Sequence, residues 1–113
     1  MNQELVVEQS SIGDAIVLRP SGDIDMSRAS SIRKAVAEAM RAQPARLIMD
    51  LSHVAYMDSS GLATLVEALQ HAMRSKVKFI LVGITPRVKS AFEITKLTGL
   101  FTIATTVEEA TKA

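Results

Sequence analysis

The chain changes from strand-like to helix-like sequence at Met57-Asp58-Ser59-Ser60-Gly61-Leu62-Ala63-Thr64-Leu65. The apolar run over residues 46–51 predicts a strand before this stretch, and helical spacing predicts a helix from about Ser60. Ser59 and Ser60 therefore lie where the first N–H groups of a helix lack partners, which is a place that favours an anion. Three roles are open for these serines: a helix cap, a catalytic nucleophile, or a phosphorylation site.

Around this stretch, predicted strands alternate with amphipathic helices. The strands begin at Leu5 and then cover residues 15–20, 46–51, 77–82 and 100–104; the helices cover about 28–41, 60–74, 86–98 and 107–112. The first two strands form a hairpin around a turn at residues 12–14, with Pro20 expected at a strand end or a sheet edge. The pattern predicts one α/β domain over residues 1–113, with parallel crossovers behind an N-terminal β-hairpin.

Apolar residues recur three or four positions apart in the first three helices, which indicates the faces that they bury. The first stripe is Ala29, Ile32, Val36, Ala39 and Met40; the second is Leu62, Leu65, Val66, Leu69 and Met73; the third is Val88, Ala91, Phe92 and Thr95. Pro44 ends the first helix, Pro86 occupies the first turn of the third helix, and Gly99 ends that third helix.

Composition excludes several classes of function. With 13 basic and 12 acidic residues, a net charge of +1 and 4% aromatic residues, the chain lacks the basic face and stacking platform of a nucleic-acid-binding protein. Cysteine is absent, residues 1–4 show no signal-peptide pattern, and the apolar run at 79–84 is too short to span a bilayer. A soluble cytoplasmic protein that is not held in a membrane is predicted.

Catalytic and cofactor motifs are incomplete. The G-x-S-x-G elbow of a serine hydrolase would need a glycine at Met57, and no acid is clearly placed to orient His53, while His71 falls in mid-helix. Neither a P-loop nor a G-x-G-x-x-G string occurs. Only Asp23 and Asp25 could begin a metal site, and turn formation or partner contact suits them better. We therefore predict no enzyme activity, no cofactor and no metal.

Physical chemistry leaves capping and regulation open for Ser59 and Ser60. Either hydroxyl can accept an N–H bond at the helix start. A phosphoryl group would instead add roughly −1.5 to −2 charges, which the helix dipole tolerates. Next to Asp58 that charge would build a negative patch, so phosphorylation could block a docked partner without unfolding the protein.

The sequence resembles the STAS-domain proteins of the bacterial anti-sigma factor antagonist type. The motifs that carry the resemblance are Gly22-Asp23-Ile24-Asp25, Leu47-Ile48-Met49-Asp50-Leu51-Ser52, Tyr56-Met57-Asp58-Ser59-Ser60-Gly61-Leu62, and Ile84-Thr85-Pro86-Arg87-Val88-Lys89 continuing to Gly99-Leu100-Phe101. The resemblance implies a STAS fold, in which the hairpin leads into a mixed sheet of four to five strands with about four helices. Ala63 departs from the second glycine of many members, which should stiffen the helix start.

In that family, a serine kinase that is also the anti-sigma factor binds ATP and phosphorylates the first serine of the motif. The resemblance therefore implies that Ser59 is the phosphoacceptor, that the unphosphorylated form binds the kinase and releases its target, and that a PP2C-type phosphatase reverses the block. The partner-binding residues that it implies are Asp23, Asp25, Asp58, Ser59, Ser60, Gly61 and Leu62. We expect Asp23 and Asp25 near Ser59, Ser60 as support for the helix, and a monomer when the protein is free. The alternative is a STAS subunit of a lipid-transport ATP-binding-cassette complex.

Overall fold

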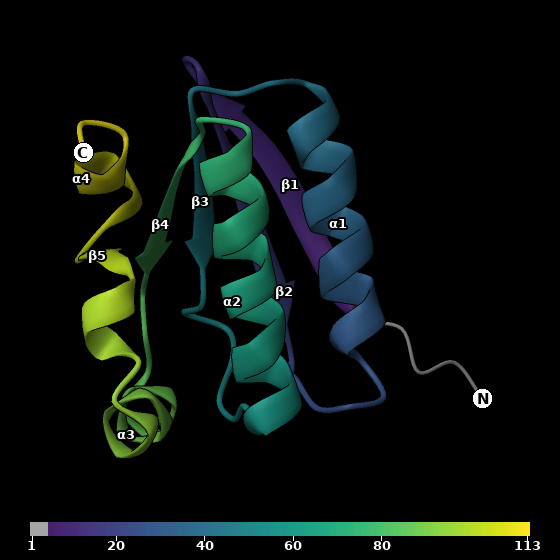
Figure 1. Cartoon of the computed structure of the whole chain (residues 1–113), viewed down its shortest axis with the longest axis vertical. Helices are drawn as coiled ribbons and strands as arrows, with labels where there is room; N and C mark the ends of the chain where they lie inside the picture. Colours follow the sequence, from purple (N-terminus) through teal and green to yellow (C-terminus); the bar gives the residue numbers. More distant parts are fainter. Residues whose placement is uncertain (1–4) are drawn as a thin grey trace.

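The structure is a computed structural model that describes residues 5–113, and it forms one five-stranded sheet with helices on both faces (Figure 1). The strands are β1 (Val6–Ile12), β2 (Ala15–Ser21), β3 (Arg46–Asp50), β4 (Lys78–Val82) and β5 (Thr102–Ala104). The helices are α1 (Ala29–Arg41), α2 (Ser59–Arg74), α3 (Pro86–Thr95), the short 3₁₀ helix η1 (Thr98–Leu100) and α4 (Val107–Ala110).

The strands lie in the order β1-β2-β3-β4-β5, so each strand neighbours the one before it in the chain. β1 is antiparallel to β2, and the four strands from β2 to β5 are parallel. Right-handed crossovers of such parallel strands place α1 and α2 on one face, whereas α4 packs on the other. The predicted α/β class, with an N-terminal hairpin and a mixed sheet, is confirmed.

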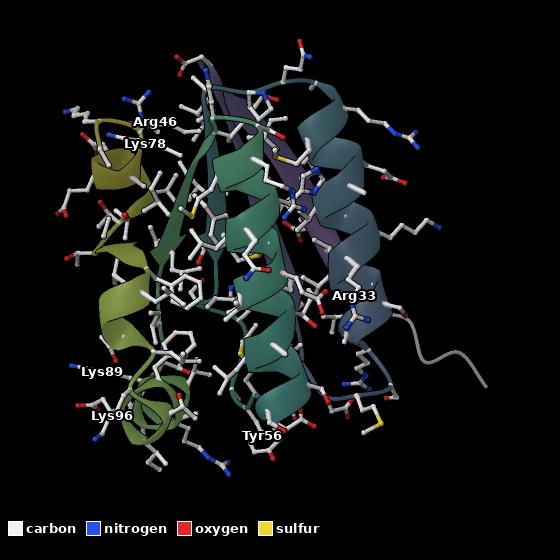
Figure 2. All side chains as sticks on the ribbon, in the orientation of Figure 1. Arg33, Arg46, Tyr56, Lys78, Lys89 and Lys96 are labelled. Atoms are coloured by element: carbon white, nitrogen blue, oxygen red, sulfur yellow. The ribbon has the colours of Figure 1, made fainter. Side chains whose placement is uncertain are left out.

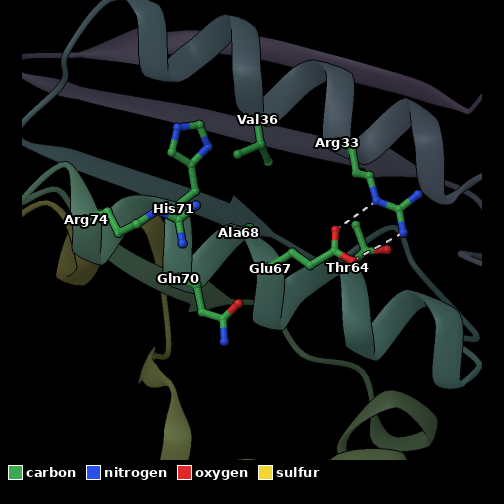
Figure 3. Close-up of a pocket in the computed structure, with 8 residues that line it drawn as sticks. All are labelled: Arg33, Val36, Thr64, Glu67, Ala68, Gln70, His71 and Arg74. Atoms are coloured by element: carbon green, nitrogen blue, oxygen red, sulfur yellow. Dashed lines mark hydrogen bonds and ion pairs between the residues drawn. The ribbon is translucent and has the colours of Figure 1, made fainter.

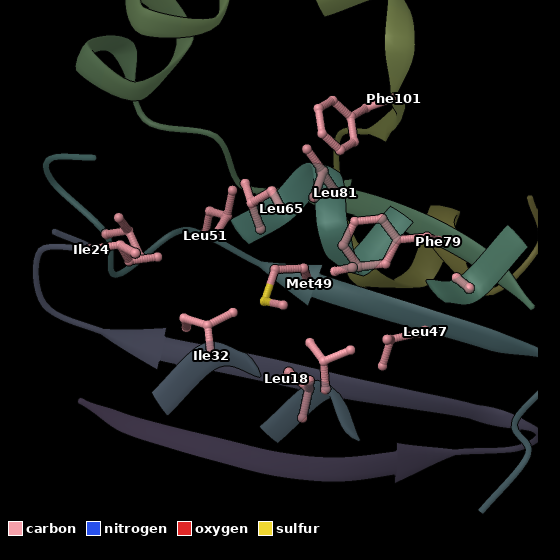
Figure 4. Close-up of a cluster of buried hydrophobic side chains, with 14 of the residues drawn as sticks. Leu18, Ile24, Ile32, Leu47, Met49, Leu51, Leu65, Phe79, Leu81 and Phe101 are labelled. Carbon is pink, nitrogen blue, oxygen red and sulfur yellow. The ribbon is translucent and has the colours of Figure 1, made fainter. Parts of the chain in front are cut away.

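The core has two unequal layers because side chains alternate along the strands. In β3, Leu47 and Met49 point into the large layer beneath α1 and α2, and Ile48 points into the small layer beneath α4. Figure 4 shows the large layer, where residues such as Ile32, Leu65 and Leu81 meet. In the described part of the chain, no helix is long and apolar enough to cross a bilayer.

The predicted stripe of α1 is confirmed, since Ala29, Ile32, Val36, Ala39 and Met40 are the buried residues of that helix. The stripe of α2 was partly wrong. Its buried residues are Gly61, Leu62, Thr64, Leu65, Ala68 and Ala72. Val66 and Leu69 are half-buried and Met73 is 67% exposed. The small side chains on the buried face allow α2 to pack closely against α1 and β4. The larger residues Val66, Leu69 and Met73 therefore lie on the side or the outer face of the helix.

Several boundaries differ from the predictions. β1 continues to Ile12 through three polar residues, because it is an edge strand whose outer positions need not be apolar. α3 ends at Thr95, four residues before Gly99, because Lys96 adopts the left-handed conformation that ends helices. Thr95 itself is exposed. Pro20 lies inside β2, but the pairing of β2 with β3 stops at Leu18. The missing N–H of Pro20 therefore removes no hydrogen bond between these two strands.

Candidate functional site

The turn before α1 and the turn before α2 lie side by side at the carboxyl ends of the parallel strands. Ile24 forms an isolated parallel bridge with Met57. The Ile24 N–H donates to the Tyr56 carbonyl at 3.0 Å, and the Asp58 N–H donates to the Ile24 carbonyl at 3.2 Å. The prediction that residues 23–25 lie near the start of α2, at the same end of the sheet, is therefore confirmed for the two backbone segments.

Gly61 makes this close approach feasible. A Cβ atom at this position would meet the Met57 side chain and would lie 2.8 Å from the Ile24 carbonyl oxygen. Each of these contacts would be closer than the Cβ contacts found in real proteins, so a larger residue at position 61 would push the Ile24 segment and the start of α2 apart. Gly61 is buried, and Leu62 beside it is only 4% exposed and belongs to the large core layer. Gly61 and Leu62, which were predicted to bind a partner, are thus buried residues that support the turn.

Asp58, and neither serine, caps α2. Its Oδ1 atom accepts the N–H groups of Ser60 at 2.9 Å and Gly61 at 3.1 Å. The interpretation in which a serine hydroxyl caps the helix is therefore wrong. The N–H groups that we expected to be free for an anion already have a carboxylate, which is a stronger acceptor than a hydroxyl.

Ser59 is the first residue of α2 and is exposed, whereas Ser60 is half-buried. The Ser60 carbonyl accepts a hydrogen bond of 2.8 Å from the hydroxyl of Thr64, which is almost fully buried. The Ser60 hydroxyl does not cap the helix, and the contact with Thr64 involves only the Ser60 backbone. Of the two hydroxyls, that of Ser59 lies on the more exposed residue.

Asp25 organises the turn that leads to α1. Its Oδ1 atom accepts the Ser27 N–H at 3.0 Å and the Ser27 hydroxyl at 2.7 Å. The hydroxyl bond is the largest cause of the lowered pKa of Asp25, so this carboxylate stays ionised. Asp23 is exposed, and its carbonyl accepts a bond of 3.4 Å from Arg28. The turn-forming role predicted for Asp25 is confirmed.

Exposed apolar and basic groups, which were not among the predicted binding residues, accompany these acidic residues. Tyr56 is 41% exposed, and the guanidinium of Arg87 at the start of α3 lies 5.6 Å from the centre of its ring. Met26, in the Asp25 turn, is 79% exposed. Figure 2 shows Tyr56 below the first turn of α2. We use the name α2 N-terminal surface for Asp23, Asp25, Met26, Tyr56, Asp58, Ser59 and Arg87.

The two histidines lie apart in the fold. His53 is exposed in the loop after β3, where its carbonyl accepts the Gly22 N–H at 3.0 Å, and no hydrogen bond joins it to Ser59 among residues 5–113. His71 lines a groove of about 340 Å³ between α1 and α2, beside the ion pair of Arg33 with Glu67 (2.8 Å) (Figure 3). Within the described residues, no three His, Asp or Glu side chains gather closely enough to hold a metal ion.

Asp50 is a buried carboxylate at the end of β3 that the sequence analysis did not single out. It is 5% exposed, its Oδ2 atom lies 3.0 Å from Arg19 Nε, and its Oδ1 atom accepts the Ser52 N–H at 3.0 Å. Burial raises its pKa, but the bonds from Ser52 and Arg19 outweigh burial, so the net pKa is lowered. Gly83, with a positive φ of 68°, gives Asp50 room, since a Cβ there would lie 2.8 Å from Oδ1.

Three comparisons place this geometry among known proteins. The family model described as "STAS domain" matches residues 6–110. An anti-sigma-B factor antagonist of Listeria monocytogenes is 31% identical over 90 residues, which cover 80% of this chain and 79% of that protein. The crystal structure of an anti-sigma factor antagonist from Mycobacterium paratuberculosis has a TM-score of 0.86 at 23% identity, covering 99% of this chain and 95% of that one.

A second similar structure is the phosphorylated form of the Bacillus cell fate determinant SpoIIAA. Its TM-score is 0.70 at 21% identity, and the match covers 95% of this chain and 97% of that chain. At this level of identity, the two solved structures show a shared fold.

Proposed function

This chain belongs to the STAS domain family, and from that premise we propose that it is an anti-sigma factor antagonist whose binding is switched by phosphorylation of Ser59. The unphosphorylated form binds an anti-sigma factor that is also a serine kinase, and this binding releases the kinase's target. A PP2C-type phosphatase restores that form. The protein performs no catalysis of its own, and the exchange takes place where the kinase finds ATP, in the cytoplasm.

The single observation that carries the proposal is that Asp58 caps α2 while the neighbouring Ser59 is exposed. Asp58 caps α2, so the Ser59 hydroxyl is not needed for folding and lies on an exposed residue. A kinase can reach this hydroxyl, and a phosphatase can reach the phosphorylated product. Ser60 is half-buried, which makes its hydroxyl less accessible to a kinase than that of Ser59.

The physical effect of the phosphoryl group follows from its neighbours. It brings about −1.5 to −2 charges to the first position of a helix, where the dipole stabilises an anion. Asp58 already occupies the N–H groups of Ser60 and Gly61, so the phosphoryl group stays exposed beside a carboxylate. The helix survives, while the α2 N-terminal surface becomes strongly negative. A partner that docks there with acidic groups would be repelled, and one that docks with apolar groups would have to desolvate the phosphoryl charge.

Other members of the surface supply the contacts that such a partner needs. Tyr56 and Met26 offer exposed apolar side chains on the two turns that lie side by side, and aromatic residues and methionine are enriched in protein interfaces. Asp23 and Asp25 offer carboxylate oxygens that can accept hydrogen bonds from N–H or hydroxyl groups of the partner. Gly61 and Leu62 act from inside, because they fix the position of the exposed residues.

Phosphorylation by an anti-sigma factor kinase from the same genome tests the proposal. The protein is incubated with that kinase and ATP, and the modified residue is located by mass spectrometry. We expect one phosphoryl group on Ser59, lost in Ser59→Ala and retained in the matched control Ser60→Ala. Phosphate on Ser60 alone, or none with any such kinase, would refute the assignment.

Binding of the same kinase provides the second test. Ser59→Ala should bind as tightly as the unphosphorylated protein, because the serine hydroxyl is not used by the fold. Ser59→Asp should bind at least about tenfold more weakly, equivalent to about 1.4 kcal/mol. Equal affinities for the two variants would rule out an electrostatic switch.

A further inference from the structure

The sheet ends in two edge strands that differ in length. β5 has three residues, and α4 follows it within the chain and packs against it. β1 has seven residues, pairs with β2 at every position without a bulge, and contains neither lysine nor proline. Edges of this length usually carry such residues or a covering element, because unpaired backbone groups attract another strand. A helix packs against each edge strand, α1 against β1 and α4 against β5, so the two edges differ in length and β1 is the longer one, without lysine or proline.

The side chains of β1 do not discourage pairing either. Val6 is 67% exposed and Ile12 is 47% exposed, and both lie on the same face of the strand because they are an even number of residues apart. Glu8 is the only charged residue, and one of its oxygens lies 3.8 Å from Arg19 on the neighbouring strand β2. The rest of the strand is neutral.

We propose that β1 pairs with β1 of a second copy of this chain in antiparallel orientation, which joins two sheets into one of ten strands. The favoured register places Gln9 opposite Gln9 of the second copy. It pairs Val6 with Ile12, Val7 with Ser11, and Glu8 with Ser10, so all seven residues take part. Each of the two exposed apolar side chains then meets its apolar counterpart.

Alternative registers are less favourable. A shift by one residue would place the helices of the two copies on opposite faces of the joint sheet, because side chains alternate. A shift by two residues in one direction would place Glu8 opposite Glu8, and like charges directly opposite each other are destabilising. A shift by two in the other direction would set Glu8 against the apolar Ile12. The register centred on Gln9 avoids all three problems.

The flank of α1 above the start of β1 carries small polar residues and charges of both signs. Ser30, Ser31, Lys34, Ala35 and Glu38 line a groove of about 340 Å³ there. Ser31 accepts the Leu5 N–H at 3.0 Å just before β1, whereas Arg33 on the opposite flank pairs with α2. A two-fold axis through Gln9 sets the two α1 helices antiparallel on the same face of the joint sheet.

The proposed dimer leaves the α2 N-terminal surface free. That surface lies at the carboxyl ends of the parallel strands, and β1 lies at the side of the sheet (Figure 1). The inference stands without the proposed function, and it replaces the monomer expected from sequence. A dimer would carry two copies of the surface and could engage two partner molecules at once.

Light scattering and sedimentation of the full chain over a range of concentrations, up to about 1 mM, test the proposal. A single pair of edge strands is a small interface, so we expect a concentration-dependent dimer of twice the 12.2 kDa chain mass. Gln9→Lys places two lysines opposite each other and should give a monomer. The matched control Ser10→Lys places each lysine opposite Glu8 and should preserve the dimer.

Circular dichroism first establishes that both variants are folded, as expected for exposed positions. A wild-type protein that stays monomeric at every concentration would overturn the proposal. So would a dimer that tolerates Gln9→Lys, or one that Ser10→Lys disrupts equally.

A cysteine substitution measures the contact directly, because the chain has no cysteine. Opposite residues of antiparallel strands have Cα atoms about 4.5–5.5 Å apart, within disulfide range. Under mild oxidation, Gln9→Cys should form a covalent dimer, and the exposed control Met73→Cys on α2 should not. Equal crosslinking of the two variants, or none in Gln9→Cys, would contradict the register.

Discussion

Asp50 and Asp58 bracket the segment that joins β3 to α2, and each carboxylate accepts backbone N–H groups just beyond its own position. Asp50 accepts the Ser52 N–H, and Asp58 accepts those of Ser60 and Gly61. Their surroundings differ. Asp50 is 5% exposed and forms an ion pair with Arg19, whereas Asp58 is half-buried and has no ion pair within residues 5–113.

This difference separates the part of the segment that holds the fold from the part that can change its charge. At Asp50, the arginine compensates the buried charge, so the carboxylate ties β2 to β3. At Asp58, the charge faces water beside Ser59, where further negative charge changes the surface more than the fold.

Asp50→Ala should destabilise the protein most, by about 3 kcal/mol, because it removes the shorter of the two ion pairs of Arg19 and leaves the Ser52 N–H without an acceptor. The free energy of unfolding from urea denaturation measures the effect. If Asp50→Ala cost no more than Asp58→Ala, the two carboxylates would not differ as described.

Gly61→Ala should cost about 2 kcal/mol, because its Cβ would collide with Met57 and the Ile24 carbonyl. Gly99→Ala is the matched control, since a Cβ at Gly99 would have no neighbour within 4 Å. Thermal melts of both variants provide the comparison. Similar melting temperatures for the two would show that the Ile24 segment does not press against α2.

Asp58→Ala should cost about 1 kcal/mol, the usual effect of losing a helix N-cap. Asp58→Asn, which keeps an oxygen acceptor, should recover most of that stability and so separates capping from charge. Urea denaturation of the three proteins gives the values. A destabilisation by Asp58→Asn as large as that by Asp58→Ala would argue against the capping role.

The acid dependence of stability should differ between wild type and Asp50→Asn. The folded-state pKa of Asp50 is lowered, so its charge contributes stability that is fully present above the ordinary value of 3.8. That contribution is lost as the pH falls through the lower folded pKa. The stability difference between the two proteins should therefore shrink on acidification below 3.8. A constant difference across this range would contradict the ionised ion pair.

Hydrophobic periodicity predicted the order and type of the elements because most of the chain obeys it. α1 is the clearest example, since its five predicted apolar positions are its buried ones. The predicted stripe of α2 was wrong at Met73, because the helix buries Ala68 and Ala72 instead. Small residues of this kind allow close packing between elements, and the periodicity of large apolar side chains does not reveal them.

The position of the site could be predicted from the sequence, but the contacts between its side chains could not. The motif around Ser59 indicated a helix start, and the sequence could not show which oxygen caps it, because Asp58 and the serines are all good caps. The contacts of Tyr56 with Arg87, and of Asp50 with Arg19, join residues about 31 positions apart. Contacts between residues so far apart depend on how the strands and helices pack, so a local sequence pattern cannot predict them.

The most direct test of the central claim compares one partner kinase binding to the unphosphorylated protein and to the fully phosphorylated protein, alongside the melting temperature of each form. We predict that phosphorylation of Ser59 weakens binding at least about tenfold while the melting temperature moves by no more than about 2 °C. Equal affinities, or a loss of binding that coincides with unfolding, would contradict a switch that acts through surface charge.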